Sequence, residues 1–154
     1  MPNRAEGDDP QATALKLLVV LARAHAAVET HLQVNVAAHG LTLTEFAILE
    51  VLFHKGPLLL GEVQRRILVS SGGVTYLVDR LEEKDLVERR ACPDDRRARY
   101  AALTPKGEAL IGRIFPDHAR MITEVMSALP VAEQRKATDL LRTLGHSAAA
   151  RPLL

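Results

Sequence analysis

The stretch from Gly61 to Leu86 places a short amphipathic segment, a tight turn and a longer amphipathic segment directly after one another. The short segment, GEVQRRIL, carries Val63 and Ile67 at a spacing that puts both on one face of a helix. This order indicates a helix-turn-helix, whose second helix keeps a polar face free for a partner. In that second helix, SGGVTYLVDRLEEKDL, the apolar residues recur at steps of three and four: Val74, Leu77, Val78 and Leu81.

An arginine-rich hairpin is expected immediately after these two helices. Within LVERRACPDDRRARYAALT, a faint alternation puts Val87 and Ala91 on one face of a first strand. Tyr100 and Ala102 share one face of a second strand. The letters PDD between them are typical of a turn, since proline fixes one backbone dihedral and aspartate bonds its own backbone. The leucines at 58–60 could add a short strand before the first of the two helices.

Further helices are expected on both sides of this central part. The first runs from about Ala12 to Ala38 and is apolar around most of its circumference. Such a helix has to be covered, either by its own chain or by a second subunit. A second helix is expected to begin at the cap Thr44 and to end at Gly56. Thr104 caps a further helix, and Pro130 opens a last helix that ends at Gly145.

The composition is that of a soluble globular protein of 154 residues, with 47% hydrophobic and 25% charged residues. A net charge of +1 argues neither for nor against a nucleic-acid partner. The placement of the basic residues is more informative than their sum. Arginine outnumbers lysine by 15 to 5, and eight of the arginines lie between Arg65 and Arg99.

Neither an enzyme nor a membrane protein is expected. The glycines in SGG lack the partners of a phosphate loop, and the serines lack a Gly-x-Ser-x-Gly context. The six histidines are scattered, so no metal or cofactor is predicted. The most apolar run, at 15–22, is far shorter than the roughly 20 residues of a membrane span. A single cysteine, Cys92, suits the cytoplasm and is either a redox sensor or a half-buried strand residue.

The segments SSGGVTYLVDRLEEKDLVERR and DDRRARYAALTPKG resemble the MarR family of winged-helix transcriptional regulators. The likeness rests on Asp95 and Arg97 in the hairpin, with Leu103, Thr104 and Gly107 behind them. The resemblance implies a mainly α fold, a winged helix-turn-helix with a two-stranded β wing, flanked by N- and C-terminal dimerisation helices. It implies the following parts: a disordered lead-in at 1–11, dimerisation helices at 12–40 and 104–146, a DNA-binding lobe at 41–103 and a flexible tail at 147–154.

The resemblance also implies which residues bind DNA. Arg97 would enter the minor groove, with Asp95 fixing its guanidinium by a charged hydrogen bond. Arg80 either binds a phosphate or ties its helix to the wing, and both alternatives stay open. The remaining expected contacts come from the second helix and the hairpin tip: Ser70, Ser71, Thr75, Tyr76, Arg96 and Arg99.

Two positions depart from the family pattern. Asp85 stands where many relatives have glycine, and aspartate tolerates the left-handed conformation better than most residues. Gly61 stands where serine or threonine is more usual, which weakens a helix cap.

The resemblance further implies a homodimer that binds a palindromic operator and acts as a repressor. A small aromatic or phenolic effector would relieve repression, with His25, Glu29 and Phe46 as candidate contacts, although a place in the core is the preferred interpretation of Phe46. The competing hypothesis is a winged-helix module that binds another protein instead of DNA, since Glu82, Glu83 and other acids lie near the proposed DNA face.

Overall fold

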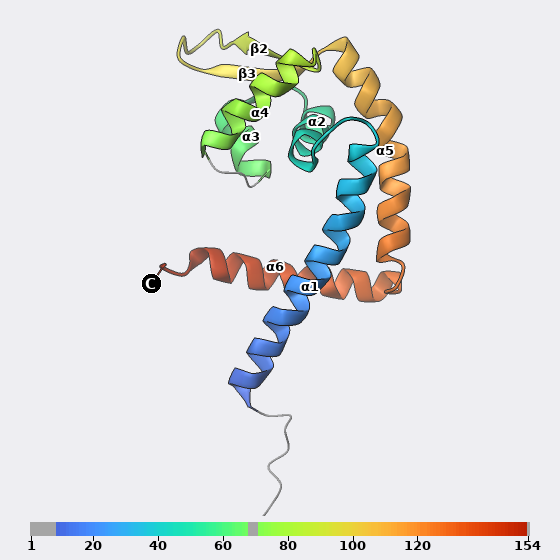
Figure 1. Cartoon of the computed structure of the whole chain (residues 1–154). Helices are drawn as coiled ribbons and strands as arrows, with labels where there is room; N and C mark the ends of the chain where they lie inside the picture. Colours follow the sequence, from blue (N-terminus) through green and yellow to red (C-terminus); the bar gives the residue numbers. More distant parts are fainter. Residues whose placement is uncertain (1–8, 68–70, 154) are drawn as a thin grey trace, which may run out of the picture. The chain divides into compact units, whose positions relative to one another are not determined.

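The computed structural model describes residues 9–67 and 71–153 (Figure 1). They form two compact units, which divide between His118 and Ala119, and each unit is described by itself. The elements in chain order are α1 (Pro10–Ala37), α2 (Leu43–Lys55), β1 (Leu58–Leu59), α3 (Leu60–Ile67), α4 (Ser71–Glu83), β2 (Val87–Ala91), β3 (Arg99–Leu103), α5 (Pro105–Met126) and α6 (Val131–Ala150).

The first two helices begin at side-chain caps. Asp9 accepts a hydrogen bond from the backbone N–H of Gln11 at 3.0 Å, so α1 starts at Pro10, two residues before the expected start. The expected cap of α2, Thr44, is wrong. Thr42 is the cap, because its hydroxyl accepts the N–H of Glu45 and the Glu45 carboxylate accepts the N–H of Thr42. Two reciprocal hydrogen bonds at Thr42 stabilise the start of the helix more than the Thr44 hydroxyl would from within the first turn.

The strands form one antiparallel sheet in the order β1-β3-β2. The predicted hairpin is confirmed, with Val87 opposite Leu103 and Ala91 opposite Arg99. The short strand suggested by the leucines is also present, and Leu58 pairs with Ala101. Asp85, in the turn between α4 and β2, has a φ of 58°, which confirms the left-handed conformation expected there.

The core of the first unit lies between the helix-turn-helix and the sheet. Of the six residues expected to face inward from the two helices, Val63, Val74, Val78 and Leu81 are buried. Ile67 and Leu77 are partly buried and pack against this core. The rest of the core comes from α2, the strands and α5, chiefly Phe46, Ile48, Leu49, Leu52, Val87, Ala101, Ile111 and Ile114.

The last helix ends later than expected. α6 continues through Gly145 to Ala150, so the predicted end at Gly145 is wrong. A glycine inside a helix costs only about 1 kcal/mol relative to alanine, and the run of alanines that follows favours the helix. Large apolar side chains on α6 are exposed in the single chain, among them Leu140, Leu141 and Leu144.

The first helix also leaves its apolar residues uncovered in the single chain. Leu15, Leu17, Leu18, Val19 and Val20 are each about half exposed or more. By length and composition alone, α1 is long and apolar enough to cross a membrane. The sequence analysis did not predict this, because it considered only the apolar run at 15–22. This is weak support for a membrane segment, because a helix at a subunit interface carries the same composition.

Gly107 provides a test of how closely the start of α5 packs on the sheet. A Cβ at this position would lie 2.0 Å from the carbonyl oxygen of Leu86. We expect Gly107→Ala to lower the free energy of unfolding by at least about 2 kcal/mol in urea denaturation, through forced movement of the backbone.

Gly112→Ala, in the same helix, is the matched control. Its Cβ would meet only the Phe53 ring edge at 3.9 Å, which is ordinary contact. Alanine is the better helix former, so this variant should be more stable by about 0.5–1 kcal/mol. Equal effects of the two substitutions would contradict the close packing at Gly107.

Candidate nucleic-acid interface

The second helix of the helix-turn-helix, α4, has one buried and one exposed face. Val74, Val78 and Leu81 point into the core, while Thr75 and Tyr76 are exposed, Tyr76 by 61%. Ser71 is the first residue of α4, and Ser70 lies outside the described residues. The exposed face therefore carries two of the side chains expected to read bases.

Arg89 joins this helix to the wing. From β2, its guanidinium forms an ion pair with Asp79 at 2.7 Å and a second one with Glu82, both on α4. Its backbone N–H also donates to Glu82 at 2.9 Å, and its guanidinium reaches the carbonyl oxygen of Thr75 at 3.4 Å. These contacts fix the recognition helix relative to the hairpin that follows it.

The sequence analysis missed Arg89. The signal that could have found it is the pair of acids three residues apart, at 79 and 82, on the helix face next to a basic strand. A guanidinium that bridges two carboxylates is a stronger connection than a single surface pair.

The wing tip is shaped by its own backbone. Asp95 accepts the backbone N–H of Arg97 at 2.9 Å, and the N–H of Ala98 donates to the Asp95 carbonyl at 3.2 Å. Arg99 donates to the carbonyl oxygens of Arg96 and Ala98, at 2.8 and 3.0 Å. Asp95 thus bonds the Arg97 backbone in this structure, and its expected bond to the guanidinium stays a prediction for the DNA complex. The side chains of Arg96 and Arg97 are exposed.

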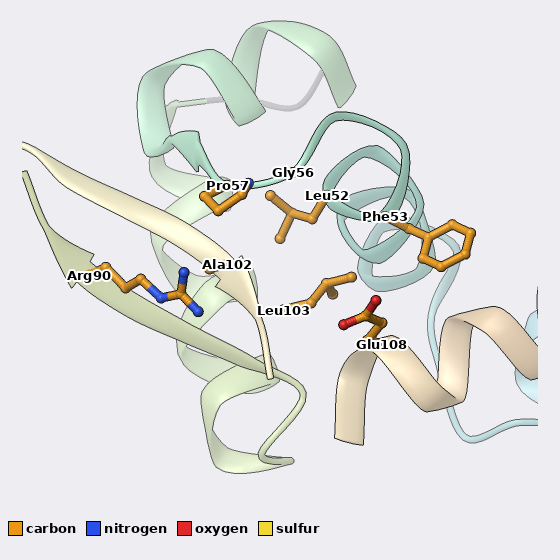
Figure 2. A pocket seen from close by; sticks show the side chains of 8 residues that line it. All are labelled: Leu52, Phe53, Gly56, Pro57, Arg90, Ala102, Leu103 and Glu108. Atoms are coloured by element: carbon orange, nitrogen blue, oxygen red, sulfur yellow. The ribbon is translucent and has the colours of Figure 1, made fainter. Parts of the chain in front are cut away.

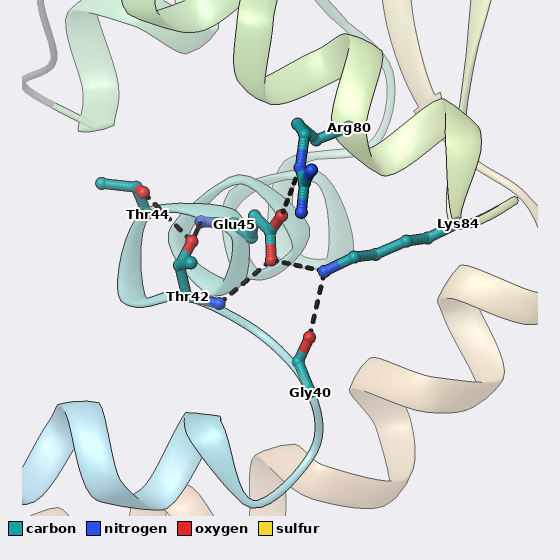
Figure 3. Close-up of polar contacts among 6 residues, drawn as sticks. All are labelled: Gly40, Thr42, Thr44, Glu45, Arg80 and Lys84. Carbon is teal, nitrogen blue, oxygen red and sulfur yellow. Dashed lines mark hydrogen bonds and ion pairs between the residues drawn. The ribbon is translucent and has the colours of Figure 1, made fainter.

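Arg80 pairs with α2 and not with the wing, which was one of its two expected partners. Its Nε lies 3.9 Å from Glu45 of α2, so it faces the helix before the helix-turn-helix rather than the wing (Figure 3). The connection to the wing is made by Arg89 instead. The Arg80 side chain is 46% exposed, and phosphate binding by its outer N–H groups stays a prediction.

Glu45 is the centre of a buried polar cluster. It is 1% exposed and accepts Lys84 Nζ at 2.8 Å, and Lys84 also donates to the carbonyl oxygen of Gly40 at 3.0 Å (Figure 3). The cluster therefore joins the turn before α2, the start of α2 and the end of α4.

The pKa of Glu45 is set by opposing effects. Burial raises it, but the hydrogen bonds from Lys84 and the Thr42 N–H, together with the charges of Lys84 and Arg80, lower it by more. The net result is a pKa below the usual value of 4.5, so Glu45 is ionised at neutral pH.

A buried histidine packs against α2 near its start. His118 of α5 places Nδ1 2.8 Å from Asn35 Oδ1 of α1, and its ring centroid lies 4.3 Å from that of Phe46. Burial lowers the pKa of His118, and the charge of Glu50 raises it by less. Phe46 is 2% exposed and fills the core here, while His25 and Glu29 form an exposed pair on α1 at 3.7 Å.

Cys92 is half-buried at the end of the wing strand, and its thiol is free. It lies beside Tyr100, and the charge of Cys92 and a hydrogen bond with it raise the pKa of the Tyr100 phenol. Among the described residues, no three histidine, cysteine, aspartate or glutamate side chains are grouped so that they could hold a metal ion.

Two pockets on this unit lie beside α2. One, of about 250 Å³, lies between the end of α2, the sheet and the start of α5, with Arg90 and Glu108 at its edge (Figure 2). The other, of about 420 Å³, lies between α2 and α3. Its lining residues are Ala47, Glu50, Val51, His54, Lys55, Arg66 and Ile67.

A recognition helix fixed to an arginine-tipped hairpin defines a winged helix-turn-helix DNA-binding protein. Residues 39–98 match the model of the MarR family. The chain is 44% identical over 135 residues to the HTH-type transcriptional regulator MhqR of Bacillus subtilis, covering 88% of this chain and 93% of MhqR. The protein therefore belongs to the MarR family, and it is a DNA-binding regulator of transcription.

Solved structures agree with this fold. Bordetella bronchiseptica BpsR is 25% identical with a TM-score of 0.76, covering 84% of this chain and 98% of that one. Sco3205 of Streptomyces coelicolor, a MarR family regulator in complex with DNA, is 22% identical with a TM-score of 0.83, covering 92% of each chain. The expected family and the mainly helical winged fold are thus confirmed.

The Glu45 cluster predicts an acid-sensitive contribution to stability. Because its folded pKa is lowered, ionised Glu45 stabilises the fold above about pH 4.5, and this contribution is lost as pH falls through the folded pKa. We expect Glu45→Gln to lower the free energy of unfolding at pH 7 by about 1–3 kcal/mol, since Lys84 loses its ionised partner.

Urea denaturation at several pH values measures this effect. The difference between parent and Glu45→Gln should shrink as pH falls below about 4.5, and any effect of His118 cancels because both proteins keep it. Glu83→Gln, at an exposed position of α4, is the control and should match the parent throughout. A pH-independent difference for Glu45→Gln would contradict the assigned ionisation.

Proposed function

We propose that this protein is a cytoplasmic homodimeric repressor that binds a palindromic operator and releases it when a small aromatic or phenolic effector binds. The observation that carries the DNA-binding mode is the Arg89 connection, which holds the exposed face of α4 and the arginine-bearing wing in one arrangement. Thr75 and Tyr76 would read the major groove, and Arg97 would enter the adjacent minor groove.

Dimer formation would cover the apolar surface that the single chain leaves exposed. That surface lies on α1, around Leu18, and on α6, around Leu141. We assign dimerisation to residues 12–40 and 104–146, and DNA binding to residues 41–103. A two-fold dimer places two recognition helices in successive major grooves, about 34 Å apart, which is why the operator should be palindromic.

Repression would be steric, since a dimer on an operator that overlaps a promoter excludes polymerase. An effector relieves repression when it favours a dimer whose two helices no longer match the groove spacing. The BpsR structure concerns regulation of DNA binding by 6-hydroxynicotinic acid, which supports this kind of control.

The pocket between α2 and α3 suits an aromatic acid best. Its volume of about 420 Å³ accommodates a single ring, and Val51 and Ile67 offer apolar contact. Lys55 and Arg66 provide cations for a carboxylate or phenolate. His25 and Glu29 remain candidates if the partner subunit brings them to a pocket, while Phe46 is better explained by its place in the core.

Selection from random duplex DNA, repeated across salt concentrations, tests the proposal. An inverted repeat should be enriched, and affinity should fall steeply with salt because phosphate contacts release counterions. A folded dimer that binds no DNA, or binds it without dependence on salt, would favour the alternative of a protein-interaction module. Steep salt dependence without an enriched site would exclude operator recognition.

Arg97→Ala tests the wing. Loss of a guanidinium from the minor groove should weaken operator binding at least about tenfold and reduce its salt dependence, with the dimer intact. Fluorescence anisotropy with the selected operator measures this. Arg113→Ala, at an exposed position of α5, is the control for a lost positive charge. Parent-like binding by Arg97→Ala would refute the role of the wing.

Leu18→Glu tests the dimer interface. A carboxylate buried at the centre of an apolar interface costs several kcal/mol, so the dimer dissociation constant should rise at least about a hundredfold. Light scattering across a concentration series measures the mass. Gln11→Glu, in the first turn of the same helix, should leave the dimer unchanged. A dimeric Leu18→Glu protein would place the interface elsewhere.

A further inference from the structure

A groove lies between the start of α3 and the wing, on the unit that carries the recognition helix. Its volume is about 340 Å³. It is lined by residues 59–62, by Arg65 of α3 and by residues 97–99 of the wing. Arg65 was not among the residues expected to bind DNA.

The groove carries an excess of positive charge. Three guanidinium groups line it, those of Arg65, Arg97 and Arg99, against the single carboxylate of Glu62. That carboxylate already has a cation of its own, because Arg66 bonds it at 3.1 Å. Within the described part of the chain, Arg65 has neither an ion pair nor a hydrogen bond.

Arg99 is held in place at the edge of the groove. One of its terminal nitrogens donates to the carbonyl oxygens of Arg96 and Ala98. The guanidinium has five N–H donors, so the others remain for a ligand. A guanidinium that is already positioned loses less conformational entropy when it binds an oxyanion.

The main chain on the other side of the groove also favours an anion. The first N–H groups of α3 have no acceptor within their helix, and Gly61 stands in this first turn. A Cβ at Gly61 would meet no atom within 4 Å, so the backbone here is open to close approach. The glycine that looked like a weak cap therefore leaves room for a bound oxygen.

We propose that this groove binds one phosphodiester of the DNA backbone, with Arg65 and Arg99 as its ligands. A guanidinium group binds phosphate oxygens through two parallel hydrogen bonds. Two guanidinium groups therefore suit a phosphodiester, which has one negative charge and two free oxygens. DNA is favoured over a free anion because the groove is lined by the wing and by α3, and α3 packs on α4, so the groove adjoins both elements that reach bases. This inference rests on the proposed DNA-binding mode.

Salt dependence of DNA binding by the full-length variant Arg65→Ala tests the proposal. Each phosphate contact contributes about 0.9 to the slope of log K against log salt. The slope should therefore fall by about 0.9 for each bound protomer, or about 1.8 for a dimer on its operator. The loss of affinity should be about eightfold per protomer at 0.1 M salt and should vanish towards 1 M. The preferred DNA sequence should not change, and nonspecific DNA should show the same loss.

Two further variants separate a specific contact from a general effect of charge. Arg113→Ala removes a positive charge from the same unit outside the groove, at an exposed position of α5, and its slope should match the parent. Arg65→Lys keeps the positive charge and should keep the salt slope. It should bind DNA less tightly, because lysine cannot form the paired hydrogen bonds of a guanidinium. Thermal unfolding should show that Arg65→Ala is as stable as the parent.

The outcomes distinguish this proposal from the one on which it rests. If the parent binds an operator but Arg65→Ala keeps its slope, or loses no more than Arg113→Ala, the groove holds no phosphodiester. If the parent binds no DNA, the DNA-binding mode itself fails. Inorganic phosphate, titrated at constant ionic strength without DNA, should not shift the NMR signal of the Arg65 guanidinium at millimolar concentration. A shift there would make the groove a site for free anions and overturn the proposal.

Discussion

The ionised carboxylate of Glu45 is buried, and an unpaired charge in that position would be too costly for the fold to keep. Its partners come from three places along the chain: the N–H of Thr42, the ammonium of Lys84 and the guanidinium of Arg80. Lys84 extends the cluster to the Gly40 carbonyl. The orientation of α4 on α2 therefore depends on this one charge, because two of its partners, Arg80 and Lys84, lie on α4.

The wing is fixed to the same helix by a second set of charges. Arg89 lies between Asp79 and Glu82, and it follows Asp85, whose left-handed backbone turns the chain from α4 into β2. The Thr104 hydroxyl donates to the Asp85 carbonyl at 2.6 Å and accepts the N–H of Gly107 at 3.0 Å, so the same turn also starts α5. Recognition helix, wing and α5 are thus joined at one corner of the lobe.

Periodicity and turn chemistry predicted most of this architecture from sequence. The buried faces of α3 and α4, the hairpin and the Thr104 cap all follow from local rules about neighbouring residues. The left-handed Asp85 follows from the resemblance to the family, whose members often have glycine there. The prediction for the cap of α2 was wrong because two threonines are suitable N-cap residues there. Only the hydrogen bond from the Thr42 N–H to the Glu45 side chain identifies Thr42 as the cap. The roles of Arg80, Lys84 and Arg89 depend on residues brought together by tertiary structure, which local rules do not address. The ion pair between Arg80 and Glu45 joins α4 to α2, and β1 and α3 lie between them in the chain. No rule about residue spacing predicts such a pair.

The position of α2 explains how a signal at its side would reach both DNA-binding elements. Its first turn holds α4 through Glu45, and Phe46 packs against His118, which in turn bonds Asn35 of α1. At its other end, Gly56 leads the chain into β1, which pairs with the wing strand β3. A displacement of α2 is therefore passed to the recognition helix and to the sheet at the same time. Since Arg89 keeps these two elements together, the lobe should move as one body, so that effector control would act on the distance between two intact lobes rather than on the shape of either.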